Sequence, residues 1–263
     1  MRLYAESKHT QFKYAKGKTD IYGKTFHDSF EIFLLLSGNT EYISDRTRLK
    51  LKPYQLVVIE PGRYHQFCID GDADDYERLV ININPTAEFM KICNTAVSDK
   101  EIMSLDENHR IVKHFIYLKD CISGVSEADF PFILDAVATD IMFLIKNSTV
   151  KEKIPRIGFN SISASAMEYI NSHFNENFTI ESLAKHLHIS SSSLSHIFKA
   201  DFGISIKKYI LQKRMNAAHY ALKNGKRAEE AAFLCGYTNY SAFYRSFVGY
   251  FGYSPSDDLK NKN

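Results

Sequence analysis

Three side chains within the first 65 residues could bind a metal ion or a polar small molecule. His27 and Glu31 stand four positions apart in an aromatic-rich segment, and His65 follows a Pro61-Gly62 turn signal. Imidazole nitrogens and carboxylate oxygens coordinate zinc and non-haem iron, and the same atoms form hydrogen bonds with polar metabolites. Whether the three side chains meet depends on the elements that carry them.

The segment 20–85 has the composition of short β-strands. Aromatic and β-branched residues are frequent in it, and turn signals interrupt it at 37–39, Pro53, 61–62 and Gly71. Short strands at such regular spacing predict a small barrel or sandwich.

The strand expected at 27–36 has two unlike faces, because successive side chains of a strand point in opposite directions. One face is apolar, which predicts packing against another element. The other face is half polar, which predicts a cavity. The apolar face carries Phe30, Ile32, Leu34 and Leu36, and the half-polar face carries His27, Ser29, Glu31 and Phe33.

Two short motifs resemble the cupin barrel. The first is His27-x-x-x-Glu31 with Gly38 seven positions later, and the second is Pro61-Gly62-x-x-His65. The metal-binding version of the cupin barrel has another histidine two positions before the first one, where this chain has Thr25. Three ligands can still hold zinc or iron if water completes the shell. We prefer a structural or ligand-contacting role and predict no metal or cofactor. The predicted effector-binding residues are His27, Glu31, Phe33 and His65.

The last hundred residues carry one helical pattern twice, about 49 positions apart. The copies are 183–205 and 230–254, and each predicts a short helix, a tight turn and a second helix. Thr179 and Ser190 are suitable N-caps in the first copy, and Gly236 suits the turn of the second. The segment 206–222 contains no Gly or Pro, so we expect one helix there, which would fix the distance between the two units.

The second helix of each copy has an outward face that could read DNA. Two helix-turn-helix units can place two helices in successive major-groove segments of one duplex. The outward residues are Ser192, Ser195 and His196 in the first copy, and Tyr240, Ser241, Tyr244 and Arg245 in the second. Because Arg245 is the permanent cation of this set, we expect the second unit to make the better guanine contact.

These residues resemble the AraC/XylS family of transcriptional regulators. The second copy followed by 251–255 (FGYSP) is similar to the family's closing stretch, and Arg214 and Ala217 match an Arg-x-x-Ala in its linking helix. The resemblance implies sequence-specific DNA binding controlled by an effector in an N-terminal barrel. This chain departs from the family where His196 replaces an arginine and 248–249 replace two basic residues, which implies fewer phosphate contacts.

Charge and cysteine usage agree with a cytoplasmic DNA-binding protein. The chain of 263 residues has a net charge of +2, but residues 156–263 carry +5 and residues 1–155 carry −3. The excess of positive charge therefore falls on the repeat, as phosphate binding requires. The four cysteines show no close pairing, and no apolar run has membrane-spanning length.

The segment 131–147 predicts an amphipathic helix that covers either the barrel or a second subunit, and we expect a homodimer. The segment 151–160 loses this periodicity and contains Pro155, which indicates a linker. The chain is therefore expected to be an α+β two-domain protein. Its predicted parts are a cupin-like β-barrel with following helices at 1–150 and an all-α domain of two helix-turn-helix units joined by a long helix at 161–263.

Two functions follow from this organisation. The first is a transcription regulator whose effector, a sugar or another small metabolite, binds in the barrel. The alternative is a metal-dependent cupin enzyme, such as a dioxygenase or an isomerase, tethered to a DNA-binding domain. The sequence shows neither a nucleophile–base set nor a phosphate loop nor a complete metal tetrad, which favours the regulator.

Overall fold

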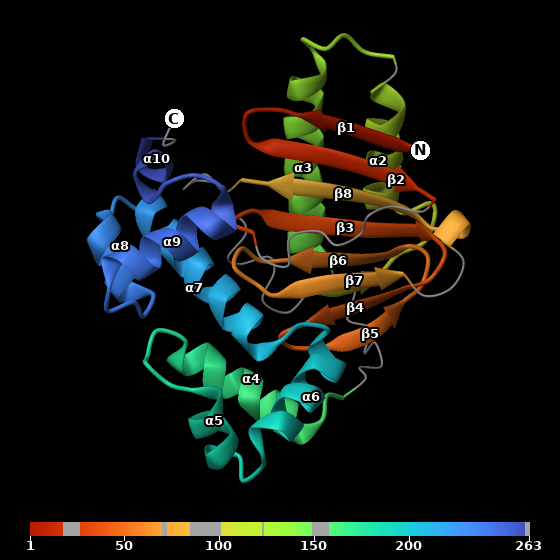
Figure 1. Cartoon of the computed structure of the whole chain (residues 1–263). Coiled ribbons are helices and arrows are strands. Elements are labelled where there is room, and N and C mark those ends of the chain that lie inside the picture. The colour runs from red at the N-terminus through yellow and green to blue at the C-terminus, as the bar shows by residue number, and fades with distance from the viewer. Residues whose placement is uncertain (18–26, 70–72, 85–100, 123, 149–157, 261–263) are drawn as a thin grey trace. The chain divides into compact units, whose positions relative to one another are not determined.

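The computed structural model describes residues 1–17, 27–69, 73–84, 101–122, 124–148 and 158–260 (Figure 1). The chain divides into two compact units, Met1–Ile157 and Gly158–Asn263. In the described residues, no helix is long and apolar enough to cross a membrane. Cys68, Cys121 and Cys235 carry free thiols.

The first unit is built from two antiparallel sheets. The larger sheet has the strand order β1-β2-β8-β3-β6-β9, and the smaller has the order β5-β4-β7. From β3 to β8 the chain crosses between the sheets at every connection except the one from β4 to β5, which stays in the smaller sheet. The strands are β1 (Arg2–Glu6), β2 (Thr10–Lys16), β3 (Phe30–Ser37), β4 (Thr40–Ser44), β5 (Arg48–Leu51), β6 (Gln55–Ile59), β7 (His65–Ile69), β8 (Glu77–Ile83) and β9 (Ile102–Ser104).

Strand β3 separates the two cores of this unit, because its side chains alternate between the sheet's faces. Phe30, Ile32 and Leu34 belong to the core on the outer side, and Phe33 and Leu35 belong to the core between the sheets. The predicted alternation is confirmed. The strand itself begins at Phe30 rather than at residue 27, so His27 precedes it.

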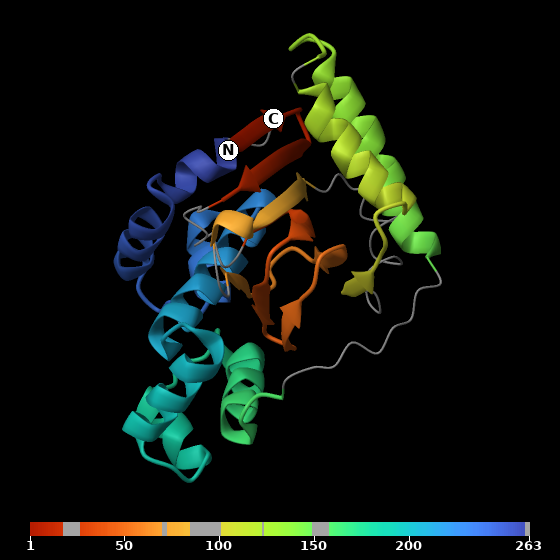
Figure 2. The same cartoon turned by 90° about the vertical axis from the view of Figure 1, so that its right-hand side faces the viewer.

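Helices α2 (Arg110–Cys121) and α3 (Phe130–Asn147) run side by side across the outer face of the larger sheet (Figures 1 and 2). The predicted helix at 131–147 is confirmed, with Pro131 in its first turn, where a missing N–H costs nothing. Its side chains Leu134, Ile141 and Ile145 are fully buried. Each contributes about 1.5–3 kcal/mol by leaving water. The apolar stripe therefore covers the barrel of its own chain.

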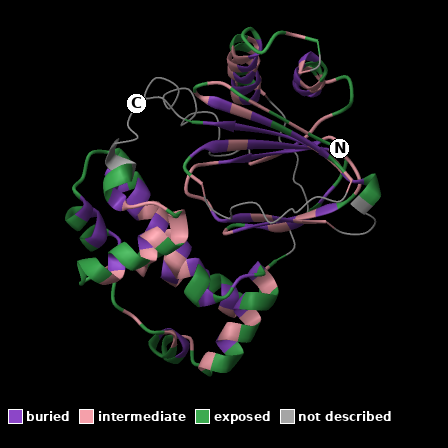
Figure 3. Ribbon diagram, turned by 45° about the horizontal axis from the view of Figure 1, so that its top comes forward, coloured by how far each residue is buried: buried purple, intermediate pink, exposed green. Residues whose placement is uncertain are grey.

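The space between the two sheets is filled by aromatic side chains. Phe33 and Phe67 stack with ring centroids 3.9 Å apart, and Tyr42 lies 5.2 Å from Phe67. All three are nearly or fully buried. Figure 3 shows that the strands of this unit are largely purple, the colour of buried residues. The half-polar strand face predicted a cavity, but in the described residues this interior is a packed core. The prediction missed the aromatic residues that β4 and β7 contribute from the opposite sheet.

The second unit consists of helices. These are α4 (Ser161–His173), α5 (Ile180–His186), α6 (Ser191–Phe202), α7 (Ile206–Lys223), α8 (Ala228–Leu234), α9 (Tyr240–Phe251) and α10 (Pro255–Lys260). The predicted repeat is confirmed: α5 and α8 both have seven residues, and α6 and α9 both have twelve. The expected N-caps also form, since the side chains of Thr179 and Ser190 accept bonds from backbone amides of α5 and α6.

Helix α7 joins the two helix-turn-helix units as expected. Near its start, Tyr209 packs on Phe198 of α6, and near its end Leu222 belongs to the core that contains Phe243 and Phe247 of α9. Arg214, in the middle of α7, donates hydrogen bonds of 2.7 and 2.8 Å to the carbonyl oxygens of Phe174 and Glu176. These carbonyls lie at and just after the end of α4, where helical partners are missing.

Candidate ligand site and DNA-reading helices

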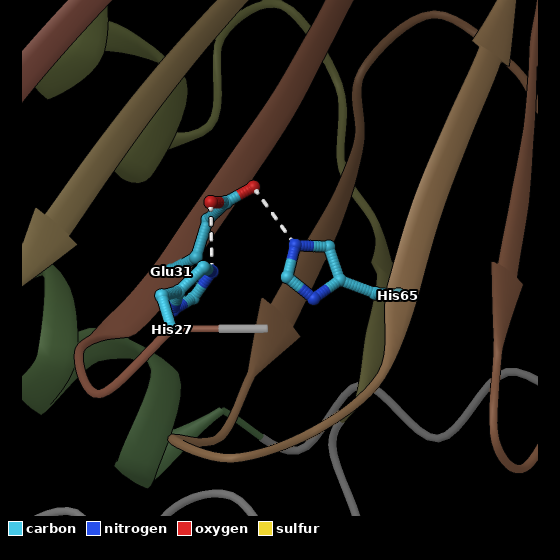
Figure 4. Close-up of side chains that lie close together, drawn as sticks. All are labelled: His27, Glu31 and His65. Atoms are coloured by element: carbon cyan, nitrogen blue, oxygen red, sulfur yellow. Dashed lines mark ion pairs between the residues drawn. The ribbon is translucent and has the colours of Figure 1, made fainter. Parts of the chain in front are cut away.

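His27, Glu31 and His65 meet at one end of the barrel (Figure 4). His27 Nε2 lies 3.1 Å from Glu31 Oε2, and His65 Nε2 lies 3.8 Å from Glu31 Oε1. The two imidazole rings are 4.8 Å apart and nearly perpendicular. At most 14% of each side chain is exposed. Figure 4 shows the two histidines approaching the carboxylate from different sides.

The chain around these residues holds the two histidines in place. The backbone N–H of Gly62 donates a 2.8 Å hydrogen bond to the carbonyl of His27, which joins the turn before β7 to the segment before β3. Gly62 has φ +75, a conformation that glycine adopts without a steric penalty. The Pro61-Gly62 motif therefore places His65 opposite Glu31.

Electrostatics keep the buried carboxyl ionised. Burial alone would raise the pKa of Glu31, but nearby His27 and His65 and the amide of Asn82 outweigh it and hold this pKa well below its usual range. Asn82 Nδ2 donates to Glu31 Oε2 at 3.0 Å, and Lys13 Nζ donates to Asn82 Oδ1 at 2.9 Å. Burial lowers the pKa of His65, an effect that Glu31 only partly opposes. The site therefore combines an anionic carboxylate with a largely neutral imidazole near neutral pH.

Phe33 lies apart from this polar cluster. It belongs to the packed aromatic core, and Phe67 stands between it and the histidines, 6.0 Å from His65 and 3.9 Å from Phe33 by ring centroids. The structure thus brings three of the four predicted effector-binding residues together. Contact of Phe33 with an effector would require the ring of Phe67 to move.

A second polar cluster near β4 has no counterpart in the sequence predictions. Glu101 accepts hydrogen bonds from the hydroxyls of Tyr42 at 3.0 Å and Ser44 at 3.2 Å, and Arg63 pairs with Asp45 at 3.1 Å. These residues line a small pocket. They come from three separate segments, 42–45, Arg63 and Glu101, which carry no shared motif, so only the pairing of the strands could reveal them.

The predicted reading residues of α6 differ in how accessible they are. Ser192 and His196 are exposed, whereas Ser195 is half-buried and its hydroxyl donates a 2.8 Å bond to the carbonyl of Ser191. The hydroxyl proton of Ser195 is therefore already in use. His188, in the turn before α6, has φ +56, as expected for a residue that tolerates this geometry.

The four predicted reading residues of α9 are all exposed: Tyr240, Ser241, Tyr244 and Arg245. The buried residues Phe243 and Phe247 hold the opposite face of α9 against α7 and α8. Tyr240 and Tyr244 lie one turn apart, with ring centroids separated by 6.3 Å. No hydrogen bond or ion pair joins Arg245 to any other residue that the structure describes. Its guanidinium is thus available to a partner.

Comparisons with known proteins agree with this geometry. A model of the AraC-like ligand binding domain matches residues 12–136, and a helix-turn-helix domain model matches residues 183–261. The helix-turn-helix-type transcriptional regulator YdiP of Escherichia coli is 34% identical over 258 residues, which cover 89% of this chain and 80% of that protein. The arabinose operon regulatory protein of Escherichia coli is 24% identical over 212 residues, which cover 78% of this chain and 72% of that protein.

Among solved structures, the C-terminal domain of AraT from Geobacillus stearothermophilus is 29% identical, covers 40% of this chain and 88% of that chain, and has a TM-score of 0.38. The fold, the sequence matches and the duplicated helix-turn-helix define a DNA-binding transcription regulator with a ligand-binding domain. The chain belongs to the AraC/XylS family of transcriptional regulators.

Proposed function

We propose that α6 and α9 of this regulator enter successive major-groove segments of one duplex, and that a small polar effector binds beside His27, Glu31 and His65. The observation that carries the proposal is the duplicated helix-turn-helix, whose second helices both expose polar side chains. The relatives are transcription regulators, which favours regulation over the enzymatic alternative. We infer that the protein acts in the cytoplasm, where its DNA is.

The two reading helices contribute unequally in this proposal. Arg245 on α9 is exposed, and an arginine can donate two hydrogen bonds to the O6 and N7 atoms of one guanine. On α6, Ser192 and His196 are exposed, whereas the hydroxyl of Ser195 donates a hydrogen bond to the carbonyl of Ser191. Tyr240, Ser241 and Tyr244 add further donors and apolar surface on α9. The second unit therefore supplies most of the base discrimination.

A sugar is the effector class that we favour. The names of two relatives refer to the arabinose operon and the lactose operon. Carboxylate and imidazole groups form hydrogen bonds with hydroxyl groups, and Glu31 has two oxygens that can accept them. Phe67 lies next to His65, and Phe33 stacks on Phe67, so both rings could pack on a sugar ring after a rearrangement of the aromatic core.

We also propose that the regulator is a homodimer through the outer side of α2 and α3. Phe132 is 78% exposed and Phe143 is 41% exposed, and a spacing of eleven residues places them on the same side of α3. Tyr117 of α2 is 49% exposed. Monomeric proteins expose few contiguous apolar patches, so a second copy of the chain is a suitable partner for this surface.

A thermal-shift scan of the full-length protein against a panel of sugars and other metabolites tests the effector site. A ligand that binds only the folded state raises the Tm. We expect the active compound to change the affinity for DNA, and this response should disappear in Glu31→Gln and His65→Ala. The affinity of residues 158–263 for DNA should be the same with and without the compound. A normal response in both variants would show that the effector binds elsewhere.

A further inference from the structure

The two imidazoles of the cluster are held in the same tautomer. His27 Nδ1 lies 2.8 Å from the carbonyl oxygen of Ser29, and His65 Nδ1 lies 3.2 Å from the carbonyl oxygen of Arg63. A carbonyl oxygen can only accept a hydrogen bond, so each Nδ1 carries the proton. In the neutral ring, Nε2 then presents a lone pair.

Both Nε2 atoms face the carboxylate of Glu31, which also only accepts hydrogen bonds when ionised. His27 Nε2 is buried and has no hydrogen-bond partner in the described residues, although Glu31 Oε2 is 3.1 Å away. The 3.8 Å separation of His65 Nε2 from Glu31 Oε1 is too long for a hydrogen bond. With both rings neutral, two lone pairs converge on a carboxylate that already accepts from Asn82, and a cation between these ligand atoms would offset their repulsion.

The distances are compatible with a metal ion. Ligand atoms at about 2.1 Å from a metal are separated by about 3.0–3.4 Å along an edge of its coordination shell and by about 4.2 Å across it. In the cluster, the ligand atoms of His27, Glu31 and His65 all lie within 4.8 Å of one another, so a bound metal would draw the most distant pair together by a few tenths of an ångström. Metal-ligating histidines commonly donate the other ring N–H to a backbone carbonyl, as both rings do here.

We propose that His27 Nε2, His65 Nε2 and a carboxylate oxygen of Glu31 bind one divalent first-row transition metal ion. Two histidines and one carboxylate form a ligand set that leaves coordination positions open. Oxygen atoms of water or of the effector would occupy them. This inference deepens the proposed effector site and rests on it, because the metal would supply the strongest bond to a hydroxyl or carboxylate of the effector. Thr25, at the position of a fourth protein ligand in metal-binding cupins, lies outside the described residues.

An ion pair without metal is the competing interpretation, and Glu31→Gln separates the two. If protonated histidines paired with Glu31, removal of the negative charge would lower the stability of the metal-free protein. If two lone pairs face the carboxylate, a glutamine amide can donate to one of them while its oxygen accepts from Asn82. We then expect a Tm of the metal-free Glu31→Gln protein no lower than that of the wild type.

The direct test is titration of untagged, chelator-treated full-length protein with Co²⁺ and with Zn²⁺. We expect one equivalent per chain, visible Co²⁺ absorption and a higher Tm with either ion. Glu31→Gln and His65→Gln should weaken binding at least about 100-fold, whereas His114→Ala, which changes a histidine paired with Asp140 on α2 and α3, should bind as the wild type does. The far-UV circular dichroism and Tm of each metal-free variant establish that it folds.

The outcomes separate the metal proposal from the effector proposal. No metal binding by the wild type, or equal binding by Glu31→Gln and His65→Gln, overturns the metal site. If chelator-treated protein still responds fully to an effector in a DNA-binding assay, the effector site stands and the metal inference is wrong. If metal binds as predicted but no compound in the panel changes DNA affinity, the metal site stands and the proposed effector control fails.

Discussion

Gly236 stands directly against the backbone of Asn175, so the turn of the second helix-turn-helix touches the segment that follows α4. A Cβ at position 236 would lie 2.7 Å from the carbonyl oxygen of Asn175 and 2.8 Å from its Cα. Such distances are shorter than van der Waals contact, so the two segments can approach this closely only with glycine at this position. Arg214 and Tyr237 add a cation–π contact of 5.6 Å next to it. The two helix-turn-helix units are therefore in contact at Gly236 and Asn175, in addition to being joined by α7.

Gly236→Ala should destabilise the second unit by about 2 kcal/mol or more, because φ +88 is strained for alanine and the new methyl group meets rigid backbone. Gly249→Ala is the matched control, since Gly249 lies in α9 with nothing within 4 Å of an added Cβ. Removing a helical glycine should leave stability unchanged or raise it by about 0.5–1 kcal/mol. Urea unfolding followed by circular dichroism measures both. Equal stability of the two variants would contradict the close contact.

Arg214→Lys should lower stability by about 1–2 kcal/mol. Lysine keeps the positive charge but lacks the planar guanidinium whose N–H groups donate to the carbonyl oxygens of Phe174 and Glu176 at the same time. Lys226→Ala, at an exposed loop position, should stay within about 0.5 kcal/mol of the wild type. The midpoint of the second unit's urea transition is the measurement. If Arg214→Lys matches the wild type, this arginine does not support α4.

Phe33→Ala should destabilise the first unit by about 3–5 kcal/mol, because Phe33 is fully buried and stacks on Phe67. Phe132→Ala removes the same ring from a side chain that is 78% exposed, so the effect on unfolding of one subunit should be within about 0.5 kcal/mol. Analytical ultracentrifugation of the Phe132 variant also reports on the proposed dimer. A small loss for Phe33→Ala would mean that the aromatic core is looser than its packing indicates.

Much of the fold follows from the sequence because periodicity and caps are local signals. The repeat, the long helix α7, the helix α3 and the alternation of β3 could all be predicted in this way. Helix α2 was not predicted, although its buried residues Ile111, Phe115 and Leu118 recur at helical spacing. Strand β1 was also missed, since it is a short edge strand with half-exposed alternate residues.

The candidate site was only partly predictable. His27, Glu31 and His65 could be assembled from two motifs, because the motifs fix the turn at Gly62 and the start of β7. The tautomers of the two histidines depend on the carbonyls of Ser29 and Arg63, which no sequence pattern reveals. The position of Phe33 behind Phe67 likewise depends on the packing of opposite sheets.

His196→Arg should tighten specific DNA binding by about 1–3 kcal/mol, because arginine adds a bidentate donor to the exposed face of α6. His9→Arg makes the same chemical change in the first unit, so it controls for the added charge. Fluorescence anisotropy at one fixed salt concentration measures both variants. If the two variants gain the same DNA affinity, the gain comes from the added positive charge in general, and α6 does not read bases.

The most direct test of the account is a footprint on duplex DNA that the full-length protein has selected from a random library, with wild type and Arg245→Ala side by side. The wild type should protect two major-groove patches about one helical turn apart, with affinity that falls steeply as salt increases. Arg245→Ala should lose about 1–3 kcal/mol on the selected site and relax the preference at one base pair. A single protected patch, or an equal loss of affinity for all sequences, would contradict the proposal that both helices lie in the major groove and that Arg245 reads a base.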